Sequence, residues 1–117
     1  MTPKLTPLQA GLIAVDELLA DKSRWTRFTF ARSKIGLWVD SSSKSAFSFC
    51  LQGAVRRCCI VFKTKRTVLS ELGRASYVLY GRDPMAVNDK LGYRAVRRVL
   101  KIARERAGVP RAKKGRE

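Results

Sequence analysis

The sequence predicts a mainly α-helical fold, a small single-domain bundle of about four helices with a short β-hairpin. Three observations predict it. N-cap residues followed by proline precede apolar residues at three- and four-residue intervals, as in helices, and in one short segment apolar and polar residues alternate, as in a strand. In addition, 45% of residues are hydrophobic, enough to form a core. At 117 residues, the chain has the length of one domain. We expect residues 1–109 to form a single basic globular domain and residues 110–117 to form a flexible basic C-terminal tail.

The first helix is expected over residues 7–22, because Thr6 offers an N-cap and Pro7 suits the first helical position. After this helix, apolar and polar residues alternate. The alternation predicts a hairpin that pairs residues 27–33 with residues 37–40.

Phe28 and Phe30 share one face of the strand expected at 27–33. The favoured interpretation is that both rings fill the core beneath the strand. The alternative is that they are exposed among basic residues, where they would stack on the bases of single strands or RNA loops.

The longest apolar segment predicts a central helix over residues 44–62, surrounded by the other three. Residues 40–43 offer several N-cap candidates for it. A further helix is expected over residues 68–80, with Thr67 as its N-cap and Gly81 as its stop.

A single helical turn is expected at residues 83–84, where an aspartate precedes a proline. The last helix is expected over residues 90–107, with Asn88-Asp89 at its start and Gly108 with Pro110 at its end. Its apolar residues trace one stripe, so its basic residues share the opposite face.

Positive charge is the strongest functional signal. The chain has 25 Lys and Arg against 9 Asp and Glu, a formal net charge of +16, and residues 90–117 hold eleven basic residues against two acidic ones, a net of +9. The predicted phosphate-binding residues of the last helix and tail are Arg94, Arg97, Arg98, Lys101, Arg104, Arg111, Lys113 and Lys114. A secondary patch is expected at Arg56, Arg57, Lys63, Lys65 and Arg66, and a further basic group surrounds the hairpin at Lys22, Arg24, Arg27, Arg32 and Lys34.

These observations predict a non-enzymatic protein that binds nucleic acid, DNA or RNA, electrostatically. The alternative is a small phage-type protein that binds a host protein or nucleoprotein complex, such as a CRISPR effector, a polymerase or the ribosome, and inhibits or redirects it. An acidic protein surface would then be the partner. A membrane is not expected as a partner, because the apolar side of the last helix lacks the bulky residues of membrane-surface helices.

The composition also excludes several kinds of chemistry. The chain has no histidine, so Ser-His-Asp and Cys-His catalytic sets cannot be formed. Three cysteines, two of them adjacent, do not supply a four-ligand zinc site, and no metal or cofactor is expected. The odd cysteine count and the absence of a charged-then-apolar leader predict a reducing, cytoplasmic location.

Several short motifs follow one another in a characteristic order along the chain, namely Trp25, Ala31-Arg32, Gly36, Val39-Asp40, Ala46, Phe49-Cys50-Leu51, Gly53-Ala54 and Asn88-Asp89. In this order they resemble an uncharacterised family of small bacterial and bacteriophage proteins, a domain of unknown function. The resemblance covers about residues 8–107, with Val87 where the family usually has Trp and with a far more basic composition. The resemblance implies a shared fold, and it implies no activity, because the family has no established one.

Read physically, the motif residues are structural. Gly53 permits close approach of another element, Cys50 fills apolar space and Asn88-Asp89 caps the last helix. The alternative makes Cys50 a nucleophile oriented by Asn88 and Asp89, but the sequence offers no base beside it. The adjacent Cys58-Cys59 pair has a redox alternative, against the simpler interpretation that one thiol is buried and one faces the neighbouring arginines.

Overall fold

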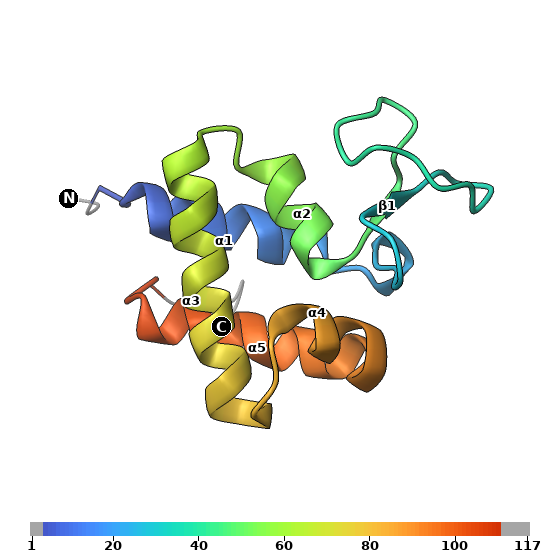
Figure 1. The fold of residues 1–117 in the computed structure, drawn as a ribbon. Helices are drawn as coiled ribbons and strands as arrows, with labels where there is room; N and C mark the ends of the chain where they lie inside the picture. Colours follow the sequence, from blue (N-terminus) through green and yellow to red (C-terminus); the bar gives the residue numbers. More distant parts are fainter. Residues whose placement is uncertain (1–3, 111–117) are drawn as a thin grey trace, which may run out of the picture.

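The computed structural model describes residues 4–110, which fold into helices packed beside a two-stranded antiparallel sheet (Figure 1). The mainly α prediction is therefore confirmed. The α-helices are α1 (Pro7–Leu18), α2 (Leu51–Cys58), α3 (Phe62–Tyr80), α4 (Pro84–Ala86) and α5 (Tyr93–Arg106). The remaining elements are the 3-10 turn η1 (Lys22–Arg24), the π-helical turn η2 (Val87–Leu91), and the strands β1 (Ala31–Arg32) and β2 (Ser48–Phe49).

The core lies where α3 crosses α1 and α5, with α2 packed against α1 and α3 (Figure 1). Each of these helices contributes fully buried apolar residues, among them Leu12, Val15, Val55, Val68, Leu72, Val96 and Leu100. Residues 25–50, between η1 and α2, project to one side of the helices and carry the sheet. We call them the projecting segment. No helix within residues 4–110 is long and apolar enough to cross a bilayer.

The first helix begins as predicted. Thr6 Oγ1 accepts a hydrogen bond from the Gln9 amide at 3.1 Å, and Gln9 Oε1 accepts one from the Thr6 amide at 3.0 Å, which completes a capping box. The helix ends at Leu18, four residues before the predicted end at residue 22, because Asp21 caps the separate turn η1.

The predicted central helix over residues 44–62 is wrong. It begins in a turn at residues 44–45 and continues into β2, its middle is α2, and α3 already begins at Phe62. The segment is apolar for different reasons along its length: Phe49 is fully buried in a strand, whereas Ile60 is 87% exposed in the turn between the helices. Thr67 is likewise not an N-cap, because it lies inside α3 and donates its hydroxyl to the Lys63 carbonyl.

The hairpin is present with a different strand partner. Ala31 pairs with Phe49 and Arg32 pairs with Ser48, so β1 is joined to residues 48–49. Residues 37–40 contribute one isolated bridge, between Arg32 and Trp38. A hydrogen bond from the Ser33 amide to the Leu37 carbonyl, 2.8 Å long, closes the turn. The predicted pairing with 37–40 is therefore present only in part, with a further backbone hydrogen bond from the Val39 amide to the Ala31 carbonyl at 3.2 Å. Val39 packs against the core, whereas Trp38 is 70% exposed.

Helix ends that depend on glycine follow the predictions at two positions. Gly81 ends α3 in the left-handed region at φ 66°, and Gly108 follows α5 at φ 77°. The start of the last helix differs from the prediction, because η2 occupies residues 87–91 and α5 begins only after Gly92.

Candidate nucleic-acid interface

The α5 helix presents a line of cations to solvent. Its apolar stripe, including Val96 and Leu100, is buried against the core. On the outer side Arg94, Arg98 and Lys101 are exposed, and their spacing of four and three residues places them on one line. We call these three residues the α5 face. None of them forms an ion pair with a residue that the structure describes.

Two arginines predicted for the same surface turn toward α1 instead. Arg97 and Arg104 each place a guanidinium nitrogen 2.5 Å from a carboxylate oxygen of Asp16. Arg97 also donates to the Asp16 carbonyl at 3.0 Å. These contacts join α5 to α1, so both arginines serve the fold and are less available to a ligand than the α5 face.

The predicted secondary patch is divided between two places. Lys63 and Arg66 line a groove of about 360 Å³ on the outer side of α3, together with Arg74. We call these three residues the α3 groove. Its floor includes Glu71, which lies 3.8 Å from Arg106 of α5. Arg111, Lys113 and Lys114 lie outside the described residues.

The other members of the secondary patch do not line this groove. Arg57 donates to the carbonyls of Ser41 and Ser43 at 3.0 and 2.9 Å, which ties the end of α2 to the projecting segment. Arg56 places its guanidinium 4.6 Å from the centre of the Phe30 ring. Lys65 is half-buried.

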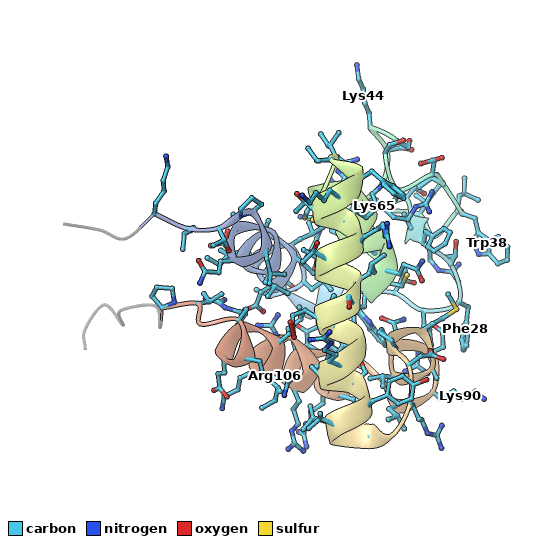
Figure 2. All side chains as sticks on the ribbon, turned by 60° about the vertical axis from the view of Figure 1, so that its left-hand side comes forward. Phe28, Trp38, Lys44, Lys65, Lys90 and Arg106 are labelled. Carbon is cyan, nitrogen blue, oxygen red and sulfur yellow. The ribbon has the colours of Figure 1, made fainter. Side chains whose placement is uncertain are left out.

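The projecting segment exposes its aromatic rings. Phe28 is 62% exposed, Phe30 37% and Trp38 70%, so the interpretation that the two phenylalanines fill the core is wrong. Figure 2 shows Phe28 and Trp38 at the same edge of the molecule, both directed away from the helices. Arginines lie over these rings as well: Arg27 is 5.7 Å from the centre of Phe28 and Arg32 is 5.9 Å from that of Trp38.

A buried asparagine holds this segment in place. Asn88 is 1% exposed, and its Oδ1 accepts hydrogen bonds from the Trp25 indole at 2.7 Å and from the Leu51 amide at 2.9 Å. Its Nδ2 donates to the Thr26 carbonyl at 3.1 Å. The predicted role of Asn88 as a helix cap is therefore wrong, because its side chain connects the projecting segment to the start of α2.

Asp89 adds a second contact to the same segment. Its Oδ1 accepts a hydrogen bond from the Phe28 amide at 3.0 Å. Phe28 has φ 71°, a left-handed conformation that costs a bulky residue free energy. The fold thus holds an exposed ring in a strained backbone position. The sequence contains a signal for this surface, the interleaving of Arg27, Arg32 and Lys34 with apolar residues, but that pattern also fits an ordinary half-buried strand.

A pocket of about 260 Å³ opens beside the Phe28 ring. It lies between the projecting segment, the start of α2 and the α4–η2 region. We call it the Phe28 pocket, and the residues of its lining that matter here are Phe28, Phe30, Cys50, Gln52, Met85 and Asp89.

The close approach predicted at Gly53 is confirmed. A Cβ atom at this position would lie 1.9 Å from the Phe30 carbonyl oxygen, so the segment that carries the aromatic rings rests directly on α2. Cys50 caps this helix, because its Sγ accepts a hydrogen bond from the Gly53 amide at 3.2 Å.

The cysteine thiols are held in their protonated form. Burial raises the pKa of Cys50, although Cys50, Asn88 and Asp89 do meet at the Phe28 pocket as the nucleophile alternative requires. A protonated thiol is a poor nucleophile, and Asn88 is already engaged in holding the backbone. Across residues 4–110, His, Cys, Asp and Glu side chains form no group of three that could hold a metal ion.

The adjacent thiol of Cys58 makes stability depend on pH. Burial, reinforced by Cys59, raises the pKa of Cys58 from its ordinary value of 9.0 to about 11. The folded state therefore binds this proton more tightly than the unfolded chain does. The stability that the protonated Cys58 thiol contributes is complete below pH 9 and is lost as the pH rises toward 11.

We therefore expect alkaline pH to destabilise the natural protein more than a Cys58→Ser variant. At about 1.36 kcal/mol per pKa unit the shift corresponds to at most about 2.7 kcal/mol, and water around this partly exposed thiol reduces that figure. The difference between their unfolding free energies should therefore change by about 1 kcal/mol between pH 8 and 11. Urea unfolding at a series of pH values measures it. Parallel pH profiles for the two proteins would contradict the expectation.

Comparison with known proteins adds no further constraint, since no family model, no curated protein and no solved structure matches this chain. The resemblance to an uncharacterised phage and bacterial family stays a hypothesis. The function is therefore inferred from the chemistry of the described surface.

Proposed function

We propose that this domain binds nucleic acid without catalysing a reaction, and that the α5 face and the α3 groove contact phosphates. The observation that carries the proposal is the unneutralised charge of these two surfaces. Among the described residues, ion pairs involve only Arg97, Arg104 and Arg106, and no residue of the α5 face or the α3 groove has an acidic partner within 4.0 Å. Like charges so arranged repel one another, and a polyanion relieves that repulsion.

The geometry of the α5 face suits a phosphate backbone. Arg94 and Lys101 are seven residues apart, which corresponds to about 10.5 Å along a helix. A strand of duplex DNA presents one phosphate per roughly 3.4 Å of axis, so one strand can supply a phosphate to each of the three cations. Arginine adds forked hydrogen bonds to phosphate oxygens.

The proposal extends to residues and properties beyond these two surfaces. The basic residues Arg111, Lys113 and Lys114 would add phosphate contacts from the C-terminal segment. A cytoplasmic location would suit the three cysteines, which are free thiols.

A binding titration over a salt series tests the proposal. Duplex DNA, single-stranded DNA and structured RNA are each titrated with the protein at several salt concentrations. Phosphate contacts predict that the logarithm of affinity falls linearly with the logarithm of salt, with a slope near 0.9 per neutralised phosphate on duplex DNA. Affinity that does not respond to salt would overturn the proposal.

A charge variant locates the contacts. The triple change Arg94→Gln, Arg98→Gln and Lys101→Gln removes the α5 face, and we expect it to weaken binding to duplex DNA by about 10- to 100-fold at moderate salt. The matched control removes the same charge from scattered exposed positions, Lys4→Gln, Lys44→Gln and Arg82→Gln. It should weaken binding by less than about threefold.

Equal losses from the two triple variants would mean that net charge, and not this face, determines affinity. The alternative of a host protein as partner is an outcome of a second measurement. A specific protein retained from nuclease-treated lysate, together with no affinity for any oligonucleotide, would replace nucleic acid by a protein partner.

A further inference from the structure

We propose that the Phe28 pocket receives one unpaired base of a single-stranded nucleic acid, while Arg27 and Arg56 bind the phosphates on either side of it. This inference rests on the proposed function and specifies the form of nucleic acid that one part of the surface recognises. It concerns the projecting segment, whereas the α5 face and the α3 groove can contact the backbone of either single or double strands.

The size and lining of the pocket fit a flat ring. Its volume of about 260 Å³ lies just below the roughly 300–1,000 Å³ typical of sites for drug-sized ligands. Phe28, Phe30 and Met85 supply apolar contacts. A nucleobase offers a planar apolar face of the kind that stacks on aromatic side chains.

The Phe28 ring is preorganised for stacking on a base. Its backbone is fixed in a left-handed conformation and its amide is bonded to Asp89, so the ring does not fold back onto the core. More than half of the side chain is exposed although a buried position would be favourable for a phenylalanine. A ligand that stacks on this ring gains contact without the cost of ordering it.

Two arginines lie over rings that line the pocket. The Arg27 guanidinium lies near two rings, 5.1 Å from the centre of Trp25 and 5.7 Å from that of Phe28. The Arg56 guanidinium lies 4.6 Å from the centre of Phe30. Neither guanidinium forms an ion pair with any residue in the described range. Each can therefore remain over its ring and direct N–H groups at a phosphate. Alternating rings and cations are the arrangement that binds a single strand, where bases and phosphates alternate.

The polar groups inside the pocket favour a base over a phosphate. The carboxylate of Asp89 would repel a phosphate, whereas it can accept a hydrogen bond from the exocyclic amine of a base. Gln52 adds an amide that both donates and accepts. A base stacked inside a duplex cannot enter this site, because its faces are covered by its neighbours.

The experiment measures affinity for three ligands of equal length: oligo(dC), a duplex, and a strand of abasic nucleotides. For Phe28→Ala we expect affinity for oligo(dC) to fall by roughly 5- to 100-fold, the range measured when one stacking side chain is removed. Affinity for the duplex and for the abasic strand should stay within about twofold of the natural protein, because the phosphate contacts remain.

Two further variants make the result specific. Phe28→Tyr keeps an aromatic face and should retain the affinity for oligo(dC) within about twofold. Tyr77→Ala is the matched control, because Tyr77 is an aromatic residue that is 59% exposed and lines neither the Phe28 pocket nor the α3 groove. It should leave the preference for oligo(dC) over the abasic strand unchanged. Circular dichroism confirms that each variant is folded.

The outcomes separate the two proposals. If the natural protein binds none of the three ligands, the proposed function fails, and this inference fails with it. If the natural protein binds but Phe28→Ala lowers all three affinities equally, or leaves that for oligo(dC) unchanged, only the base-binding pocket is overturned. If only the base-binding pocket is overturned, a different occupant, such as an apolar side chain of a protein partner, takes its place.

Discussion

Replacing Asn88 with alanine should lower the free energy of unfolding by about 3–5 kcal/mol. The substitution leaves the Trp25 indole and the Leu51 amide without their acceptor and the Thr26 carbonyl without its donor. A buried polar group left unpaired costs about 1–3 kcal/mol, and the loss concerns three groups at once. Urea unfolding followed by circular dichroism measures the change.

The control for this variant is Ser42→Ala. The Ser42 hydroxyl donates to Asp40 at 2.9 Å in an exposed turn, where water replaces the lost bond, so we expect a change below about 1 kcal/mol. An Asn88→Ala protein as stable as the Ser42→Ala protein would show that the Asn88 contacts do not hold the projecting segment to the helices.

Two glycine-to-alanine substitutions in helices should have opposite effects. At Gly53 the new Cβ would meet the Phe30 carbonyl oxygen at 1.9 Å, a clash that requires the Phe30 backbone to move away from α2. We expect a loss of about 3 kcal/mol or more, the upper range for overpacking. At Gly73 in α3 nothing lies within 4 Å, so the usual helix preference should stabilise the domain by about 0.5–1 kcal/mol.

The same unfolding measurement tests both glycine variants. Because the projecting segment rests on Gly53, its alanine variant should also weaken binding to single strands more than binding to duplex DNA, if the Phe28 pocket acts as proposed. A Gly53→Ala protein with natural stability would mean that α2 and the Phe30 backbone are not in fixed contact.

Helices whose signals are local could be predicted from the sequence. The N-cap at Thr6, the glycine stop at residue 81 and the buried stripe of α5 each depend on neighbours within one or two turns. The segment over residues 44–62 could not be predicted in this way. Its apolar residues belong to a strand, a short helix and an exposed turn, and only the tertiary fold separates these environments.

The candidate site shows the same division. The outward line of Arg94, Arg98 and Lys101 follows from helical spacing alone. In contrast, Arg97 and Arg104 find their acidic partner 81 and 88 residues away along the chain. No local pattern reveals such a pairing.

The exposure of the aromatic rings could not be predicted from the sequence for a related reason. Alternation predicts that Phe28 shares a buried face with Phe30, but the strand is only two residues long and starts after both of them. The contacts that fix this segment come from Asn88 and Asp89, which lie about sixty residues further along the chain. In the sequence these two residues indicate a helix cap, because an Asn-Asp pair before an apolar stripe is the usual signal for one.

The salt dependence of duplex DNA binding, compared between two proteins of equal charge, tests the central claim most directly. The proteins are the triple glutamine variant of the α5 face and the triple variant at Lys4, Lys44 and Arg82. If the three cations of the face each neutralise a phosphate, the slope of log affinity on log salt should be smaller by about 2–3 in the face variant than in the control. Equal slopes would contradict the claim that this helix contacts the phosphate backbone.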